Sequence, residues 1–280
     1  MTASVSVAAI QMVSGFEVEQ NLVRARELLE QAVADGARVA VLPENFAAFQ
    51  NRRLAELGQS EARGEDGSIQ SFVAREAARL GLWIVAGSLP MGTRPDGTVV
   101  PDGRVRAACM VWNDQGERVA RYDKIHLFDA MVGDSQGRYQ ESDLFEPGDE
   151  VVTVDTPAGR LGLSICYDLR FPELYRRLRE AGAEWVVVPS AFTHRTGEAH
   201  WEPLLRARAI EDQVWICAPN QGGQHDERRQ TWGHSMIIDP WGSVVAERSE
   251  DGPGVVSAVV DRDQLASTRS AIPVWEHRRL

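Results

Sequence analysis

The alternation of short apolar runs with amphipathic helical segments constrains this chain more than any other feature of its sequence. Alternation predicts a strand over residues 5–12, and apolar runs predict strands over 39–42 and 82–86. Apolar residues at helical spacing predict helices over 21–34 and 69–80. The beginning of the chain therefore reads β-α-β-α-β. Because each element has an apolar face to bury, the pattern indicates helices packed on sheets in layers.

The rest of the chain continues this alternation but contains strand pairs joined by very short turns. The predicted elements are strands over 106–112, 117–122, 151–155, 161–166, 185–188, 214–218, 235–238 and 255–260, and helices over 172–181 and 201–212. Turns at 113–116 and 156–159 are too short for the crossover that parallel strands need, so the sheets must be mixed. No linker-like stretch divides the chain, so an α/β sandwich forming a single domain over 1–280 is expected.

The composition limits the partners that the protein can bind. The 280 residues carry a formal net charge of -11 at pH 7, whereas nucleic-acid binding depends on clustered Lys and Arg. There is no apolar run of about 18 residues, and the N-terminus lacks a basic flank, so neither membrane spanning nor secretion is expected. Cys109, Cys166 and Cys217 are spaced for neither a disulfide framework nor a zinc site, which favours a reducing, cytoplasmic setting.

Cys166 is the candidate nucleophile because of its position at a predicted junction between a strand and a helix. An apolar strand leads into it, polar residues follow it, and Pro172 then opens a helix. Such a junction directs backbone N–H groups and the positive end of a helix at the sulfur, which favours the thiolate. A cysteine taken alone is more often a small buried apolar residue, and Cys109 and Cys217, each inside an apolar strand, are interpreted in that way.

Glu44 and Lys124 are the candidate charged groups of a site. Glu44 directly follows an apolar strand, where a partly desolvated carboxylate would suit a general base. Lys124 follows a predicted hairpin strand and could neutralise a developing oxyanion. It opens the segment 124–148, which shows no sustained period and is interpreted as a functional loop. Taken singly, each residue is explained at least as well by a surface charge or ion pair.

Three motifs link these residues. They are LPENF at 42–46, YDKIHLF at 122–128 and CYDLRFPEL at 166–174, in that order along the chain. Their contexts together resemble the nitrilase superfamily of carbon-nitrogen hydrolases. The similarity continues through PSAF at 189–192, AHWE at 199–202, RARAIE at 206–211, GHS at 233–235 and DPWG at 239–242. It thus covers nearly the whole chain.

The resemblance implies both a fold and a mechanism. The fold is an αββα sandwich that dimerises through the helices beside the nucleophile to give αββα-αββα. The implied catalytic residues are Cys166 as nucleophile, forming a thioester, Glu44 as base and Lys124 as electrostatic stabiliser. Glu141 would be a fourth polar residue that holds Lys124, and the backbone N–H of Tyr167 would stabilise the oxyanion. The resemblance implies no cofactor and no metal, and the sequence contains no motif for either.

Within the superfamily the chain is similar to Nit-type amidases, to their deaminated glutathione amidase branch first and to the ω-amidase branch second. The implied substrate is a small amide that carries a carboxylate. Arg170 is the candidate for binding that carboxylate, because guanidinium offers a bidentate fork. Phe192, Arg195 and Thr196 are further candidates for substrate contact, and each arginine could instead form a structural ion pair.

Other functions remain open from the sequence. A hydrolase of N-carbamoyl groups or nitriles could use the same three residues. A Cys-His hydrolase could draw its base from six histidines, which are His126, His194, His200, His225, His234 and His277. An inactive interaction protein could also keep the fold, although the joint presence of Glu44, Lys124 and Cys166 argues against it.

Overall fold

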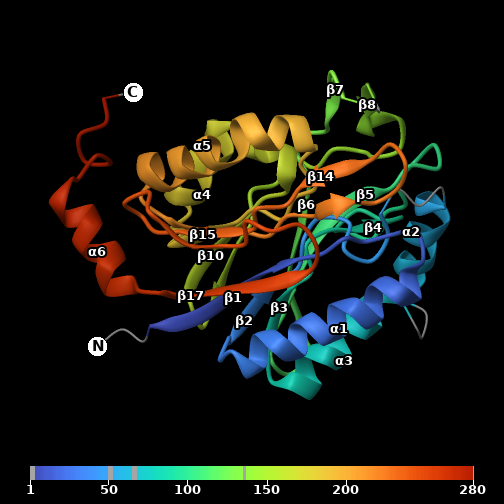
Figure 1. The fold of residues 1–280 in the computed structure, drawn as a ribbon, viewed down its shortest axis with the longest axis horizontal. Helices are drawn as coiled ribbons and strands as arrows, with labels where there is room; N and C mark the ends of the chain where they lie inside the picture. The colour runs from blue at the N-terminus through green and yellow to red at the C-terminus, as the bar shows by residue number, and fades with distance from the viewer. Residues whose placement is uncertain (1–3, 50–52, 65–67, 135–136, 280) are drawn as a thin grey trace.

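A computed structural model describes residues 4–49, 53–64, 68–134 and 137–279, which form four layers (Figure 1). Two sheets lie face to face at the centre, and a pair of helices covers the outer face of each. The N-terminal residues considered for a secretion signal lie partly outside the described range, because residues 1–3 are not part of it. The layer order confirms the predicted αββα sandwich.

The first sheet is mixed and carries seven strands. In spatial order they are β17 (Gly254–Val260), β1 (Val5–Gln11), β2 (Val39–Val41), β3 (Trp83–Val85), β5 (Arg106–Trp112) and β4 (Leu89–Met91), with β6 (Arg118–Asp123) paired to β5. The strands β1, β2 and β3 run parallel, and the remaining pairs are antiparallel. The helices α1 (Val18–Ala34) and α3 (Ile69–Leu80) cover its outer face.

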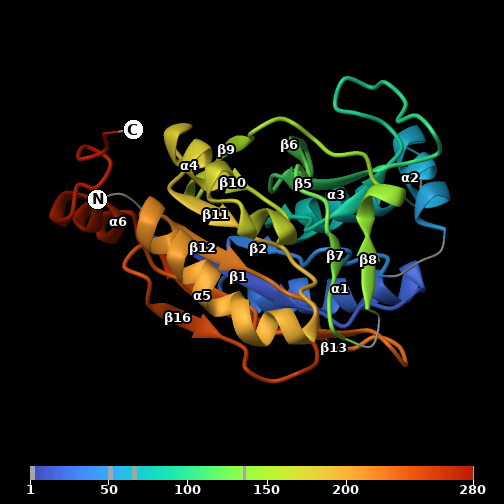
Figure 2. The same cartoon turned by 90° about the horizontal axis from the view of Figure 1, so that it is seen from above.

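The second sheet is also mixed. Its order is β16 (Val244–Glu247), β15 (Met236–Ile238), β12 (Trp215–Ala218), β11 (Trp185–Val187), β10 (Gly159–Leu163) and β9 (Thr153–Thr156). The helices α4 (Pro172–Glu180) and α5 (His194–Asp212) lie on its outer face. Figure 2 shows α5 crossing over β12, with α6 (Arg262–Ala271) beyond one end of the helix and the ribbon β7 (Asp129–Met131) and β8 (Arg138–Gln140) beyond the other.

Strand β1 shows why the sequence folds in this way. Val7 and Ala9 belong to the core between the sheets, whereas Ala8 and Ile10 belong to the core beneath α1 and α3. Successive side chains of a strand point to opposite faces, and both faces are covered here. A strand buried on both sides therefore appears in the sequence as an almost continuous apolar run, not as an alternation with polar residues.

The predicted helix over 69–80 has the bounds expected from its local signals. The Ser68 side chain accepts a hydrogen bond from the Ser71 N–H at the N-cap, and Gly81 ends the helix in the left-handed conformation with φ 58°. Pro172 likewise occupies the first turn of α4, as predicted.

Several predicted boundaries are wrong. The helix expected over 201–212 begins instead at His194, because the Thr193 side chain caps its N-terminus. The strand expected over 161–166 ends at Leu163, and Cys166 instead begins the short 3-10 helix η2 (Cys166–Arg170). The segment 124–148 is not only loop, since it contains β7, β8 and the 3-10 helix η1 (Glu141–Asp143).

Some elements were not predicted. They are α2 (Leu54–Arg63), α6, β4, β16 and the ribbon of β13 (Gly222–Gln224) with β14 (Gln230–Trp232). Gly58 inside α2 weakened the helical signal. In the part of the chain that the structure describes, no helix combines the length and apolar character of a membrane-spanning segment. Those residues also include no group of three or more His, Cys, Asp or Glu that could hold a metal ion.

Candidate active site

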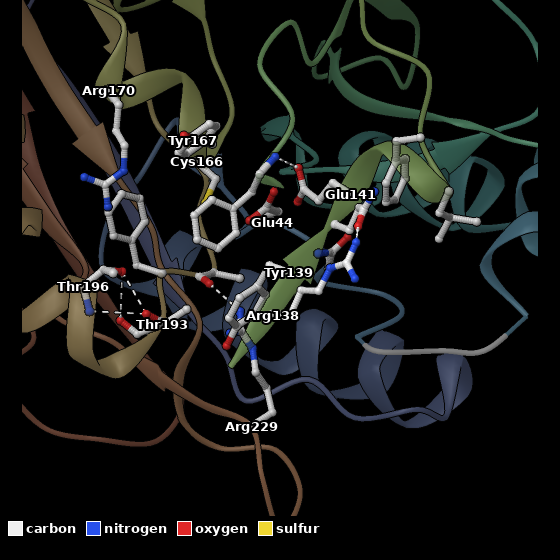
Figure 3. Close-up of a pocket in the computed structure, with 17 residues that line it drawn as sticks. Glu44, Arg138, Tyr139, Glu141, Cys166, Tyr167, Arg170, Thr193, Thr196 and Arg229 are labelled. Atoms are coloured by element: carbon white, nitrogen blue, oxygen red, sulfur yellow. Dashed lines mark hydrogen bonds between the residues drawn. The ribbon is translucent and has the colours of Figure 1, made fainter. Parts of the chain in front are cut away.

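The predicted charged residues meet in space although they lie far apart in the sequence. Glu44 follows β2, Lys124 follows β6, and Glu141 begins η1. The Lys124 Nζ atom lies 2.9 Å from Glu44 Oε1 and 2.8 Å from Glu141 Oε2. Cys166 lies near enough for the charges of Glu44, Lys124 and Glu141 to act on its thiol, and Figure 3 shows it beside Glu44 and Glu141. The arrangement brings one thiol, one ammonium and two carboxylates together.

The charge of Lys124 is maintained by its two partners. Its side chain is almost fully buried, and burial by itself would lower its pKa. The negative charges of Glu141 and Glu44 outweigh this effect and raise the pKa of Lys124 well above its usual value. Burial raises the pKa of Glu141, while the Lys124 ammonium opposes that shift. Lys124 is therefore a permanent cation, fixed between two carboxylates.

The backbone at Cys166 is in an uncommon conformation. Its φ is 48°, in the left-handed region that non-glycine residues rarely adopt, and its N–H donates to the Pro189 carbonyl at 3.0 Å. Tyr167 is the second residue of η2, where N–H groups generally have no partner within the helix. The turn therefore presents the sulfur and a backbone donor on the same short segment.

The expectation that this junction favours the thiolate is wrong for the resting protein. Cys166 is only 9% exposed, and burial raises the pKa of its thiol well above the ordinary value. The charge of Glu44 raises the pKa further, and the smaller opposing effect of Lys124 does not cancel these two. Desolvation thus dominates over the helix end. A thiol held in this way needs a base at the moment of attack.

Asp168, which the sequence reasoning did not single out, fixes the nucleophile turn. It is fully buried and accepts hydrogen bonds from the Ile165 N–H at 2.8 Å and from the Tyr122 hydroxyl at 2.7 Å. It also contacts His126, whose N–H donates to it at 3.1 Å and whose Nδ1 lies 2.7 Å away. Asp168 therefore ties the Cys166 segment to the segment that carries Lys124. The sequence signal that could have identified Asp168 was its position in the motif CYDLRFPEL, two residues after Cys166.

A second set of contacts holds Glu44. The Gln221 side chain donates to the Glu44 carbonyl at 3.0 Å and to the Ser14 hydroxyl at 2.9 Å. Gly87 lies directly behind this turn, where an added Cβ would come within 2.0 Å of the Pro43 carbonyl oxygen. Only glycine fits there, so the strand end that carries Glu44 can approach its neighbour closely.

A cavity of about 250 Å³ opens above these groups (Figure 3). It is lined by Glu44, Asn45, Phe128, Arg138, Tyr139, Gln140, Glu141, Leu144, Phe145, Cys166, Tyr167, Arg170, Ala191, Phe192, Thr193, Thr196 and Arg229. Its walls thus combine aromatic rings, three arginines and the two carboxylates. Such a mixture suits a small polar molecule that carries negative charge.

Three of the four predicted substrate contacts line this cavity. The Arg170 guanidinium lies 5.4 Å from the centre of the Phe192 ring and 3.2 Å from His200 Nδ1. Within the described residues it forms no ion pair with a carboxylate. Thr196 also faces the cavity, and its hydroxyl hydrogen-bonds the Thr193 hydroxyl at 2.8 Å. Arg170 is therefore available to bind an anionic ligand.

Arg195 is placed differently from the other three. It is absent from the cavity wall, and its Nη1 donates to the Gly133 carbonyl. Sequence reasoning also missed Arg138 and Arg229, which do line the cavity. Both lie in polar segments without periodicity, so no local signal distinguished them from surface arginines.

Comparisons with known proteins agree with this geometry. Residues 6–270 match the family model described as carbon-nitrogen hydrolase. The chain is 42% identical over 274 residues to a deaminated glutathione amidase from Yersinia enterocolitica, covering 98% of this chain and 93% of the relative. It is also 42% identical over 275 residues to the human protein of that name, covering 98% and 82%.

Two solved structures share the fold. The Caenorhabditis elegans NitFhit protein superposes with a TM-score of 0.87 at 36% identity, covering 99% of this chain but 66% of that longer protein. Saccharomyces cerevisiae Nit3, described as a member of branch 10 of the nitrilase superfamily, has a TM-score of 0.83 at 27% identity, covering 99% and 97%. The four-layer arrangement therefore recurs in experimentally determined structures.

Proposed function

This chain belongs to the carbon-nitrogen hydrolase family and is an amidase, and from that premise we propose that it hydrolyses the carbon-nitrogen bond of a small carboxylate-bearing amide through a thioester on Cys166. One observation carries the proposal. The ammonium of Lys124 is held within hydrogen-bond distance of Glu44 and Glu141, beside a buried thiol at a cavity. An arrangement of this kind can deprotonate a nucleophile and stabilise an oxyanion at one place.

In the acylation step, Glu44 takes the proton of the Cys166 thiol as the sulfur attacks the amide carbon. A carbon-sulfur bond forms, and the carbonyl oxygen becomes an oxyanion that the Lys124 ammonium and the Tyr167 N–H stabilise. When the carbon-nitrogen bond breaks, Glu44 returns the proton to the nitrogen, so that a neutral amine leaves, or ammonia where the amide is primary. The acyl group remains on Cys166 as a thioester.

In the deacylation step, the same carboxylate activates water. Glu44 accepts a proton from the water molecule as its oxygen attacks the thioester carbon, and the second oxyanion forms at the same site. Collapse of this intermediate breaks the carbon-sulfur bond and releases the carboxylic acid, and Glu44 gives its proton to the departing sulfur, which restores the thiol. Glu141 positions Lys124 in both steps, since it accepts hydrogen bonds from both the Lys124 ammonium and the Phe128 N–H.

The acyl group that we propose is that of deaminated glutathione. Relatives at about 42% identity across nearly the whole chain carry the name deaminated glutathione amidase. Arg170, which lines the cavity without a carboxylate partner in the described chain, supports a substrate that supplies a carboxylate. Phe192 and Thr196 would contact the same substrate from the neighbouring wall.

We further propose how the protein is organised in the cell. Residues 1–280 act as one domain, and two copies pack through α4 and α5 to form a homodimer. These helices form the outer layer next to η2, so the interface would support the nucleophile turn. A cytoplasmic location is supported by the three cysteines, all of which are free thiols.

The substrate assignment is tested by measuring hydrolysis of deaminated glutathione, α-ketoglutaramate and an N-carbamoyl amino acid. The product measured is cysteinylglycine for the first substrate and ammonia for the other two. We expect the highest kcat/KM for deaminated glutathione. A higher value for either of the other two substrates would reassign the protein to another amide.

The role of Arg170 is tested by comparing a carboxylate-bearing amide with its neutral analogue. We expect Arg170→Ala to lose most of the preference for the acid. Arg195→Ala is the matched control, because Arg195 lies outside the cavity wall and its loss should leave the preference intact. Equal discrimination in wild type and Arg170→Ala would remove the proposed role.

A further inference from the structure

Arg229 is a buried cation in the cavity wall, and all its side-chain partners are neutral. Arg229 is only 8% exposed to solvent. One Nη atom donates to the Tyr139 hydroxyl at 2.6 Å and the other to the Ala191 carbonyl at 2.9 Å. The guanidinium also lies 4.9 Å from the Tyr139 ring centre and 5.6 Å from that of Phe49. The remaining N–H groups of the fork have no acceptor within the described chain.

The acidic and titratable groups near Arg229 do not neutralise it. No carboxylate within the described ranges forms an ion pair with its guanidinium. The Asp226 carboxylate instead accepts the backbone N–H groups of Arg228 and Arg229. Asp134 accepts a hydrogen bond from the Tyr139 hydroxyl, so this hydroxyl lies between the Asp134 carboxylate and the Arg229 guanidinium. Burial lowers the pKa of His225 to about 4, so this neighbour is neutral at pH 7 and adds no charge of either sign.

A buried cation without a counter-ion is unfavourable unless something else supplies the negative charge. The open side of Arg229 is the cavity that contains Cys166. Figure 3 shows Arg229 and Arg170 reaching this cavity from separate segments, one next to β14 and the other in η2. The missing anion is therefore best supplied by a ligand that lies between the two arginines.

We infer that Arg229 forms a second carboxylate subsite, separate from Arg170, so that the preferred substrate is an amide with two carboxylates. This inference rests on the proposed function, because it describes the same cavity. The planar fork of arginine suits a carboxylate, and the Tyr139 and Phe49 rings keep the guanidinium in place. An amide with one carboxylate can occupy only one of the two sites.

The test uses deaminated glutathione, which has two carboxylates, and the same compound with its glycine carboxylate converted to a methyl ester. In wild type, esterification should lower kcat/KM by about 10- to 100-fold, the usual effect of losing a hydrogen-bonded ionic contact. In Arg229→Met the acid should lose about the same factor, whereas the ester should be cleaved as well as by wild type. The preference for the acid thus disappears.

Two further variants separate ligand binding from a structural role. Arg228→Met changes the net charge equally but removes an exposed side chain outside the cavity wall, and it should keep the wild-type ratio of acid to ester. Arg229→Lys keeps the positive charge, and it should retain part of the preference. If Arg229→Met fails to fold, Arg229→Lys provides the same test.

The possible outcomes are distinguishable. If Arg229 only holds Tyr139 and Ala191 in place, then Arg229→Met will slow hydrolysis of the acid and of the ester equally. The unchanged ratio will overturn the inference but not the proposed function. A wild-type enzyme that cleaves the acid and the ester at equal rates will overturn it as well. If wild type hydrolyses neither compound, the proposed function falls together with the inference.

Discussion

Tyr122 provides a sensitive test of how the nucleophile turn is held. Its side chain is fully buried, and its hydroxyl donates to Asp168 Oδ2 at 2.7 Å while accepting the Ile125 N–H at 3.3 Å. Tyr122→Phe removes only the hydroxyl. The change deletes one hydrogen bond to a buried charged group and leaves the Ile125 N–H without this partner.

The expected magnitude follows from the charge of the acceptor. A hydrogen bond to a charged group contributes about 1.5–3 kcal/mol, so the free energy of unfolding should fall by about that amount. At about 2–4 °C per kcal/mol for a chain of comparable size, Tm should fall by about 3–12 °C. The turnover number should also fall about 10-fold or more, since small displacements of a reacting group are costly.

Tyr175→Phe is the matched control. Tyr175 is equally buried, but its hydroxyl pairs with the neutral Ser164 hydroxyl at 2.9 Å, and Ser164 keeps a second hydrogen bond to the Val187 carbonyl. Loss of this hydrogen bond in Tyr175→Phe should lower the free energy of unfolding by only about 0.5–1.5 kcal/mol. Thermal unfolding and the rate of amide hydrolysis are measured for both variants. If Tyr122→Phe matches Tyr175→Phe in stability and keeps wild-type turnover, the reasoning about Asp168 is wrong.

Three other perturbations test separate parts of the account. Lys124→Met leaves two carboxylates without their shared cation and should lower kcat for amide hydrolysis about 100- to 1000-fold. A loss below about threefold would refute the electrostatic role of Lys124. Because the pKa of Cys166 is raised, its rate of alkylation by iodoacetamide should still increase with pH above about pH 8.5. The fully buried Cys109 and Cys217 should stay unlabelled. An alkylation rate of Cys166 that stops rising below about pH 7 would contradict this. Folding raises the pKa of Asp212 to about 7, and its carboxylate oxygens have no hydrogen-bond partner among the described residues. The folded state therefore favours the protonated side chain, and the stability that this gives is lost as the pH rises from about 4 through 7. Asp212→Asn should therefore stabilise the protein on the order of 2 kcal/mol more at pH 8 than at pH 5, and denaturant unfolding with no such difference would disprove it.

Periodicity was enough to predict an α/β sandwich with mixed sheets, whereas the αββα layer order was predicted only from the family resemblance. The alternation of β1, α1, β2, α3 and β3 follows from apolar spacing, and the caps at Ser68 and Gly81 are local signals. These features depend on residues that are neighbours in the sequence. The prediction could therefore be made without knowing how the chain packs.

The start of α5 could not be predicted in this way. Gly197 and Pro203 lie within the helix, and both residue types disfavour helix interiors. The structure gives a reason for the glycine, since a Cβ there would lie 2.1 Å from the Trp232 Cβ atom. Close packing on β14 therefore overrides the local preference, and that contact is invisible in the sequence.

The candidate site could be predicted from the sequence only in part. The resemblance pointed to Glu44, Lys124, Glu141 and Cys166, and the structure brings these residues together. Their roles remain a proposal. Arg229 had no comparable signal, because its partners lie at Tyr139 and Ala191, far away along the chain.

The central claim is that the sulfur of Cys166 attacks the amide carbon. The most direct measurement is the rate at which Cys166→Ser hydrolyses deaminated glutathione, compared with Cys217→Ser at a buried strand position, after circular dichroism shows that both variants fold. The account predicts that Cys166→Ser loses at least about a thousand-fold in kcat, whereas Cys217→Ser stays within a few-fold of wild type. Wild-type turnover by Cys166→Ser would contradict it.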